Sequence, residues 1–306
     1  MKYAVLGAGG TGGMISTYLE KGGKNSVLIA RGDHCQKNKK KGLQVKHLWD
    51  GTEEIIPVKA IEVDKYSEEP DVIFVCVKGY SLESTVPFIR QVASPDTVII
   101  PILNIFGAGR KLQERLSNLY VLDGCIYVSA NREAPGRLLQ HAPTMRIVFG
   151  PRQGQEDREV LAEIESDLMS CNISPGYSHH VERDCLEKFS YVSPIGAAGI
   201  YLDSTAGAFQ HEGEARELFK AMIREIECLA EVMGFAFEKD YVDIDLKILS
   251  GMPPETTTSL QRDVAAGRQS EVDGLVYQVV RMAHKYNVDV PQYEKVAAFL
   301  QQKGIK

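Results

Sequence analysis

Long apolar runs, paired cysteines and metal-spaced histidines are all missing from this sequence. No stretch reaches the length of a membrane span, so we expect no membrane partner. The 6 cysteines are scattered without a C-x-x-C, and the 7 histidines show no ligand spacing such as H-x-x-x-H, which argues against a metal site. The first predicted strand starts at Lys2, so no signal peptide is expected. The scattered cysteines suit a reducing cytoplasm.

An excess of basic residues is also missing. The chain has 35 Lys and Arg against 41 Asp and Glu, a formal net charge of −6. Such a chain cannot neutralise phosphates along a duplex, so we expect no nucleic-acid partner. Its 306 residues, 44% hydrophobic and 25% charged, are typical of a globular protein with one large domain or two ordinary ones. A homodimer is compatible with these features.

The first thirty residues contain the most informative pattern. Residues 2–6 are short, apolar and free of breakers, which predicts a buried strand. The segment Gly-Ala-Gly-Gly-Thr-Gly follows at once at 7–12 and fits G-x-G-x-x-G, a helical pattern covers 14–19, and a second strand is predicted at 26–30. This strand, glycine-rich turn, helix and strand indicate a dinucleotide-binding unit. The alternative is a glycine-rich turn that binds nothing.

Each position of the motif has a physical role in such a unit. Gly7 allows the tight turn, Gly9 lets backbone N–H groups approach a pyrophosphate, and Gly12 lets the helix pack close to the strand. The helix N-terminus, at Gly10 and Thr11, offers unpaired N–H donors and the positive end of the helix dipole. We therefore expect these five residues to bind the cofactor phosphates.

The end of the second strand indicates which dinucleotide is bound. NAD-binding units usually place an acidic residue there, whereas this chain has Arg31, whose planar guanidinium suits a 2′-phosphate. Four lysines that follow closely make the local field positive: Lys37, Lys39, Lys40 and Lys41. The pattern favours NADPH over NADH. Two alternatives remain: Asp33 is the acidic residue if the strand ends late, or Arg31 is a solvated loop charge.

Two further strands are predicted to end near the same site. Residues 71–77 form a continuous apolar run that leads into Lys78, and residues 97–103 form another that leads into Asn104. Carboxyl ends of parallel strands are where α/β sheets present residues to a ligand. Strands and helices alternate up to residue 177, which predicts a doubly wound parallel sheet of the Rossmann type.

The pattern changes near residue 180. From 181 onward we find helical periodicity and no convincing strand, so we predict a dinucleotide-binding domain at 1–180 and an all-helical domain at 181–306. The longest predicted helix, 213–233, has four apolar residues on one face: Leu218, Met222, Ile226 and Leu229.

Three polar positions of the helical domain are candidates for chemistry. Lys188 lies among apolar residues, and Ser259 and Glu271 lie in stretches rich in hydroxyls and carboxylates on either side of a helix junction. Ser270 is a candidate N-cap for the helix that carries Glu271. Without further information, each charged residue is more often part of a solvated helix face than a catalyst.

Taken together, these stretches resemble the ketopantoate reductase (2-dehydropantoate 2-reductase) family over nearly the whole chain. The resemblance rests on the order of the glycine motif, Arg31, Lys78 and Asn104, followed by Lys188 and the Ser-x-x-x-Asp…Ser-Glu-Val-Asp pattern at 259–273. It implies an NADPH-binding domain followed by a helical domain, with a small 2-oxo acid bound in the cleft between them.

The resemblance also implies residue roles. Lys188 is the general acid that protonates the carbonyl oxygen, Glu271 accepts hydrogen bonds from substrate hydroxyls, and Ser259 helps to bind the substrate carboxylate. Asn104 orients Lys188 and the nicotinamide end of the cofactor, and Lys78 lies along the cofactor.

The chain departs from the family pattern at three positions. Family members usually carry asparagines four and eight residues after the catalytic lysine, where this chain has Val192 and Gly196, and they have Asn-Gly where this chain has Asn104 followed by Ile105. The loss of polar partners weakens the binding of a hydroxylated substrate by about a few kcal/mol unless other groups replace them. Tyr191 and Ser193 are candidate replacements.

The sequence is therefore compatible with three functions. The first is NADPH-dependent reduction of ketopantoate to pantoate. The second keeps the mechanism and changes the substrate to another 2-oxo acid. The third is an NADPH-binding sensor without turnover.

Overall fold

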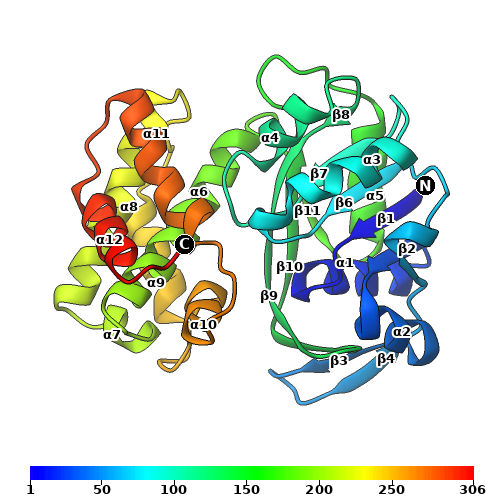
Figure 1. Cartoon of the computed structure of the whole chain (residues 1–306), viewed down its shortest axis with the longest axis horizontal. Coiled ribbons are helices and arrows are strands. Elements are labelled where there is room, and N and C mark those ends of the chain that lie inside the picture. Colours follow the sequence, from blue (N-terminus) through cyan, green and yellow to red (C-terminus); the bar gives the residue numbers. More distant parts are fainter. The chain divides into compact units, whose positions relative to one another are not determined.

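A computed structural model describes all 306 residues (Figure 1). The chain divides into two compact units. The first comprises Met1–Leu103 and Gly107–Glu182, and the second comprises Asn104–Phe106 and Arg183–Lys306. The three residues Asn104–Phe106 thus group with the second unit, although the chain on both sides of them belongs to the first.

The first unit contains a parallel sheet with the strand order β5-β2-β1-β6-β7-β8. Its strands are β1 (Lys2–Leu6), β2 (Asn25–Ala30), β5 (Ala60–Glu62), β6 (Val72–Val75), β7 (Val98–Pro101) and β8 (Tyr120–Val121). All residues of β6 and β7 are buried, as expected for strands covered on both faces. The chain leaves β1 in one direction to β2 and later returns to its other side with β6, so the order reverses at β1. The predicted Rossmann-type sheet is confirmed.

Helices connect these strands. They are α1 (Gly10–Lys21), α2 (Gly32–Lys41), η1 (Val63–Lys65), η2 (Gly79–Ser81), η3 (Glu83–Thr85), α3 (Val86–Val92), α4 (Ala108–Arg115) and α5 (Val160–Ser170). Helix α2 was not predicted, because it has no apolar stripe: its buried residues are His34, Cys35 and Asn38, and its other positions are mostly charged.

A second sheet in this unit has the order β11-β10-β3-β4, with β9 paired to β10. Its strands are β3 (Leu43–His47), β4 (Glu53–Ile56), β9 (Asp123–Ala134), β10 (Arg137–Gly150) and β11 (Ser174–Tyr177). Strands β3 and β4 form an antiparallel hairpin that lies off the main sheet. The expectation of one sheet up to residue 177 is wrong, because β9 and β10 form an antiparallel hairpin and β10 pairs in parallel with β3.

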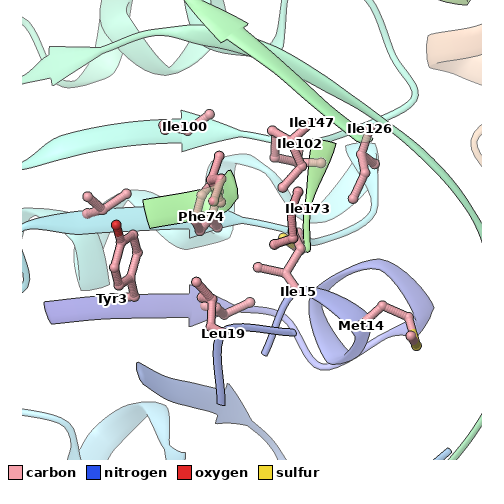
Figure 2. Close-up of a cluster of buried hydrophobic side chains, with 14 of the residues drawn as sticks. Tyr3, Met14, Ile15, Leu19, Phe74, Ile100, Ile102, Ile126, Ile147 and Ile173 are labelled. Carbon is pink, nitrogen blue, oxygen red and sulfur yellow. The ribbon is translucent and has the colours of Figure 1, made fainter. Parts of the chain in front are cut away.

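One core joins the two sheets of the first unit. Side chains from both sheets and from α1 meet there, among them Tyr3, Ile15, Phe74, Ile126 and Ile147 (Figure 2). Helix α5 adds Leu161, Ile164 and Leu168. The core therefore fixes α1, and with it the glycine-rich turn, between the two sheets.

The second unit contains helices and no strand, as predicted. Its helices are α6 (Val181–Tyr201, which begins in the first unit), α7 (Ala206–Gln210), α8 (Glu214–Val232), α9 (Tyr241–Ser250), α10 (Ser259–Ala265), the π-helix η4 (Asp273–Tyr277), α11 (Gln278–Tyr286) and α12 (Pro291–Gln302). Helix α8 is central and lies against α7, α9, α11 and α12. Its buried face includes the four predicted apolar residues. No helix of the protein has the length and apolarity that a membrane crossing needs.

The start of the helix that follows Ser270 differs from a regular α-helix. The backbone is helical from Val272 to Tyr286, but Asp273–Tyr277 forms a π-helix. Ser270 was expected to cap this helix, yet its hydroxyl lies 3.4 Å from the carbonyl oxygen of Lys306. Neither feature is visible in a periodic pattern, because both depend on contacts with distant segments.

Asp245 of α9 is a buried acid inside this helical unit. Only 1% of its surface is exposed, and its Oδ2 lies 3.1 Å from the hydroxyl oxygen of Ser190 on α6. Burial raises the pKa of Asp245 to about 8, although the Ser190 hydrogen bond acts to lower it. The Ser190 hydroxyl also lies 2.7 Å from the carbonyl oxygen of Glu187. A protonated Asp245 can thus donate to Ser190 while Ser190 donates to Glu187.

We expect Asp245→Asn to stabilise the protein at neutral pH. The ordinary value is 3.8, so between pH 4 and 8 the folded state keeps a proton that the unfolded state has lost. The stabilising contribution of the protonated group is complete below pH 4 and declines as the pH rises to 8. Urea unfolding should therefore show the advantage of the variant growing by about 1 kcal/mol per pH unit between pH 5 and 7. The exposed Asp289→Asn is the control, and parallel curves for the variant and the wild type would contradict the assignment.

Candidate cofactor and active site

The glycine-rich turn at the end of β1 leaves no room for side chains at three of its positions, Gly7, Gly10 and Gly12. Gly7 has a φ of +108°, and a Cβ there would lie 2.7 Å from the carbonyl oxygen of Cys76. A Cβ at Gly12 would lie 1.9 Å from the carbonyl oxygen of Gly7. The first glycine therefore permits the turn and the last permits α1 to pack on it, as the motif predicts.

The turn is open at Gly9 instead. A Cβ at Gly9 would meet no atom within 4 Å, and Gly9 begins α1 without a side-chain cap. No acidic residue lies in the first turn of α1, which includes Gly10 and Thr11. Uncapped N–H groups beside an open glycine are the features that a dinucleotide pyrophosphate needs, so these residues fit the cofactor.

Arg31 lies where the sequence analysis expected it. Strand β2 ends at Ala30, and Arg31 is the exposed residue that begins α2. The β1–β2 pairing matches Leu6 with Ile29, so the Arg31 backbone is close to the glycine-rich turn. Asp33, the alternative acidic residue, lies in the first turn of α2 and is also exposed.

Two residues near this turn were missed by sequence reasoning. His34 is 3% exposed, and its Nδ1 accepts a hydrogen bond of 2.8 Å from the Gly136 N–H at the tip of the β9–β10 hairpin. Burial, together with the charge of Arg132, lowers the pKa of His34. Arg132 pairs with Leu138, which faces Gly13 of α1, so Arg132 lies on the face of the second sheet that adjoins α1. No local signal links this hairpin to the first strands.

Lys78 follows β6 and precedes the short helix η2. The predicted strand continued to residue 77, whereas β6 ends at Val75. Because β6 pairs in parallel with β1, Lys78 still lies at the same sheet edge as the glycine-rich turn.

In the second unit, two predicted site residues are in contact. Lys188 of α6 donates a hydrogen bond from Nζ to Oδ1 of Asn104, at 2.7 Å. Both residues belong to the second unit, because Asn104 groups with the helices. An amide oxygen at this distance holds the ammonium group in one place.

The other two candidates are placed at helix starts. Ser259 is half-buried at the first position of α10, where Thr258 and Gln261 form a capping box, so the Ser259 hydroxyl is not needed as a cap. Glu271 is 6% exposed and immediately precedes the helical turn that leads into η4.

Two of the three positions that depart from the family pattern, Val192 and Gly196, lie on the same face of α6 as Lys188, because they follow it by four and eight residues. A Cβ at Gly196 would lie 3.1 Å from Cδ2 of Leu260, so α10 packs closely there. Ser193 is wrong as a replacement partner, since its hydroxyl bonds the Leu275 carbonyl oxygen and the Tyr293 hydroxyl. The Tyr191 ring instead packs edge-on against Phe219 of α8.

Comparison with known proteins agrees with this arrangement. The family model described as "Ketopantoate reductase PanE/ApbA" matches residues 3–154, and the model described as "Ketopantoate reductase PanE/ApbA C terminal" matches residues 180–304. The chain belongs to the ketopantoate reductase family. As a member, it is a nicotinamide-dependent oxidoreductase.

Relatives in this family span the whole chain at low identity. An uncharacterized oxidoreductase, YkpB of Bacillus subtilis, is 24% identical over 303 residues, or 98% of each chain. The 2-dehydropantoate 2-reductase of Aquifex aeolicus is 23% identical over 310 residues, covering 100% of this chain and 97% of the relative. A solved ternary structure of D-mandelate dehydrogenase with NADH and anilino(oxo)acetate has a TM-score of 0.85 at 19% identity, covering 99% and 98% of the two chains.

Proposed function

We propose that this ketopantoate reductase family member reduces a 2-oxo acid with NADPH, with 2-dehydropantoate as the first candidate substrate and pantoate as the product. The observation that carries the proposal is the 2.7 Å hydrogen bond between Lys188 and Asn104. We assign cofactor binding to residues 1–180 and substrate binding to residues 181–306. We also propose the cytoplasm as its location, because the cysteines are scattered along the sequence without a C-x-x-C or a disulfide-type spacing.

Lys188 is the proton donor in this proposal. Reduction of a ketone places negative charge on its oxygen, so a positive proton donor at that oxygen lowers the barrier. The bound nicotinamide supplies the hydride. Asn104 holds the Lys188 Nζ in place through Oδ1, which restricts where the proton is delivered.

The remaining residues bind and orient. Ser259 binds the substrate carboxylate, and Glu271 accepts hydrogen bonds from substrate hydroxyls, which suits a carboxylate that is buried beside the start of η4. Lys78 contacts the cofactor from the carboxyl edge of the first sheet, beside the glycine-rich turn.

A second candidate substrate class is favoured by the packing at Gly196. Leu260 fills the space beside this residue, and Val192 adds a second apolar side chain on the same face of α6. Apolar side chains in the proposed substrate site lower the affinity for a hydroxylated substrate and favour a 2-oxo acid with an apolar side chain.

The test follows NADPH absorbance with 2-dehydropantoate and with a panel of aliphatic and aromatic 2-oxo acids. Turnover that is fastest with 2-dehydropantoate supports the first candidate, and turnover confined to apolar 2-oxo acids supports the second. Tight NADPH binding without oxidation across the panel would leave the sensor function and reject the reductase.

Arg31 should decide the choice between NADPH and NADH. We expect Arg31→Ala to raise the KM for NADPH by about tenfold or more, because a charge-assisted contact to the 2′-phosphate is lost, and to leave the KM for NADH unchanged. Arg132→Ala should act in the same direction with a smaller effect. The control is Lys285→Ala, which removes an exposed charge in the last turn of α11 in the second unit. Equal effects of Arg31→Ala on the two cofactors would contradict the NADPH assignment.

A further inference from the structure

The π-helix η4 carries a notch that one side chain fills. A Cβ at Gly274 would lie 2.3 Å from Cγ2 and 3.2 Å from Cβ of Ile105. Ile105 is 7% exposed, and its β-branched side chain cannot turn its methyl group away without a change of rotamer. Gly274 does not have a positive φ, so the glycine is not required by its backbone conformation. It is required by the space that Ile105 occupies.

A second contact holds the 104–106 segment against the helical backbone that continues from η4 into α11. The Gln278 side chain, four residues after Gly274, donates a hydrogen bond of 2.8 Å from Nε2 to the carbonyl oxygen of Phe106. Ile105 and Phe106 are therefore both held by residues one helical turn apart. Asn104 is the next residue of this short segment, and all of these residues belong to the second unit.

The π-helix is itself anchored to the helix that carries Lys188. The Ser193 hydroxyl of α6 bonds the carbonyl oxygen of Leu275 within η4. Lys188 lies five residues before Ser193 on α6, and it bonds Asn104. Each of the three segments therefore contacts the other two. Helix α6 contacts η4 through Ser193, η4 contacts the 104–106 segment through Gly274, and this segment contacts α6 through the Lys188–Asn104 hydrogen bond.

We propose that Gly274 is a positioning residue that seats Ile105 and thereby sets the Asn104 amide against the Lys188 ammonium group. The inference deepens the proposed function and rests on it for its effect on turnover. A methyl group at position 274 must displace Ile105, and a displacement of Ile105 moves its neighbour Asn104. Misplacement of a catalytic group by about 1 Å can reduce a rate by about a hundredfold.

The experiment compares Gly274→Ala, Ile105→Ala and the double variant. In a crystal structure of Gly274→Ala, the distance between Lys188 Nζ and Asn104 Oδ1 should exceed hydrogen-bonding range. Its kcat should fall by about tenfold to a hundredfold with the KM for NADPH unchanged. The double variant should recover the hydrogen bond and most of kcat, because alanine at 105 lacks the methyl group that collides. The matched control is Gly207→Ala, whose new methyl group would lie 3.0 Å from Cβ of Pro254 and should leave the Lys188–Asn104 distance unchanged.

The readouts separate this inference from the proposed function. A Lys188–Asn104 distance that Gly274→Ala leaves intact, or a double variant no better than Gly274→Ala, overturns the inference. If the wild type reduces no 2-oxo acid, the proposed function fails, while the crystal distances still decide the role of Gly274. If Gly274→Ala does not fold, Gln278→Leu replaces it, since it removes the bond to Phe106 without a steric clash and should lengthen the same distance.

Discussion

Lys188→Ala should lower kcat for 2-oxo acid reduction by about a thousandfold while NADPH binds as tightly as before. Loss of the ammonium group removes both the proton donor and the positive charge at the developing alkoxide. NADPH binding should survive, because the glycine-rich turn and Arg31 lie in the first unit. The measurements are NADPH absorbance at saturating substrate and NADPH fluorescence titration without substrate.

Two companion variants sharpen this test. Lys188→Arg keeps a positive charge but gives up the proton less readily, so it should recover binding of the 2-oxo acid without recovering kcat. Asn104→Ala removes the 2.7 Å contact and should lower kcat less than Lys188→Ala does. Full turnover by Lys188→Ala would exclude Lys188 as the acid even if the substrate is correct.

Gly12→Ala should lower the stability of the protein, whereas Gly9→Ala should lower its affinity for NADPH. At Gly12 the new Cβ would lie 1.9 Å from the carbonyl oxygen of Gly7, and both groups are backbone-bound, so the turn and α1 must separate. We expect a loss of about 3 kcal/mol or more in the free energy of unfolding, measured in urea without cofactor.

At Gly9 the new Cβ meets nothing within 4 Å, and its φ of −74° suits alanine. Stability should be unchanged, whereas we expect the methyl group to obstruct the pyrophosphate in the proposed cofactor site. We expect NADPH affinity to fall by about tenfold or more. If Gly9→Ala binds NADPH as the wild type does, the cofactor does not approach this turn closely, and the assignment of the motif is wrong.

The features predicted best are those whose cause is local. The glycine-rich turn is one, because Gly12 meets the carbonyl oxygen of Gly7 within the same short segment. The apolar face of α8 is another, because a period of 3.6 residues is written along the chain itself. Helix α2 was missed because its buried residues include the polar His34 and Asn38, so no apolar period marks it in the sequence.

The features that were not predicted depend on partners far away in the sequence. Strand β10 pairs Leu138 with Val45 of β3, and nothing in either short segment specifies the other. The hairpin that carries Arg132 contacts α1 through Leu138 and α2 through the hydrogen bond between Gly136 and His34, and both partners lie far away in the sequence.

The candidate active site shows the same division between local and distant causes. Residue type and order were enough to select four of its residues through the resemblance to ketopantoate reductases: Lys188, Asn104, Ser259 and Glu271. The sequence by itself determined the glycine-rich turn, the helical character of the second unit and the family, because turns, periodicity and motif order are properties of the chain. Only the tertiary structure decided that residues 104–106 join the helical unit, that Ile105 fills the notch at Gly274 and that Ser193 faces inward. The physical reason is that each of these depends on which surfaces meet when the chain folds.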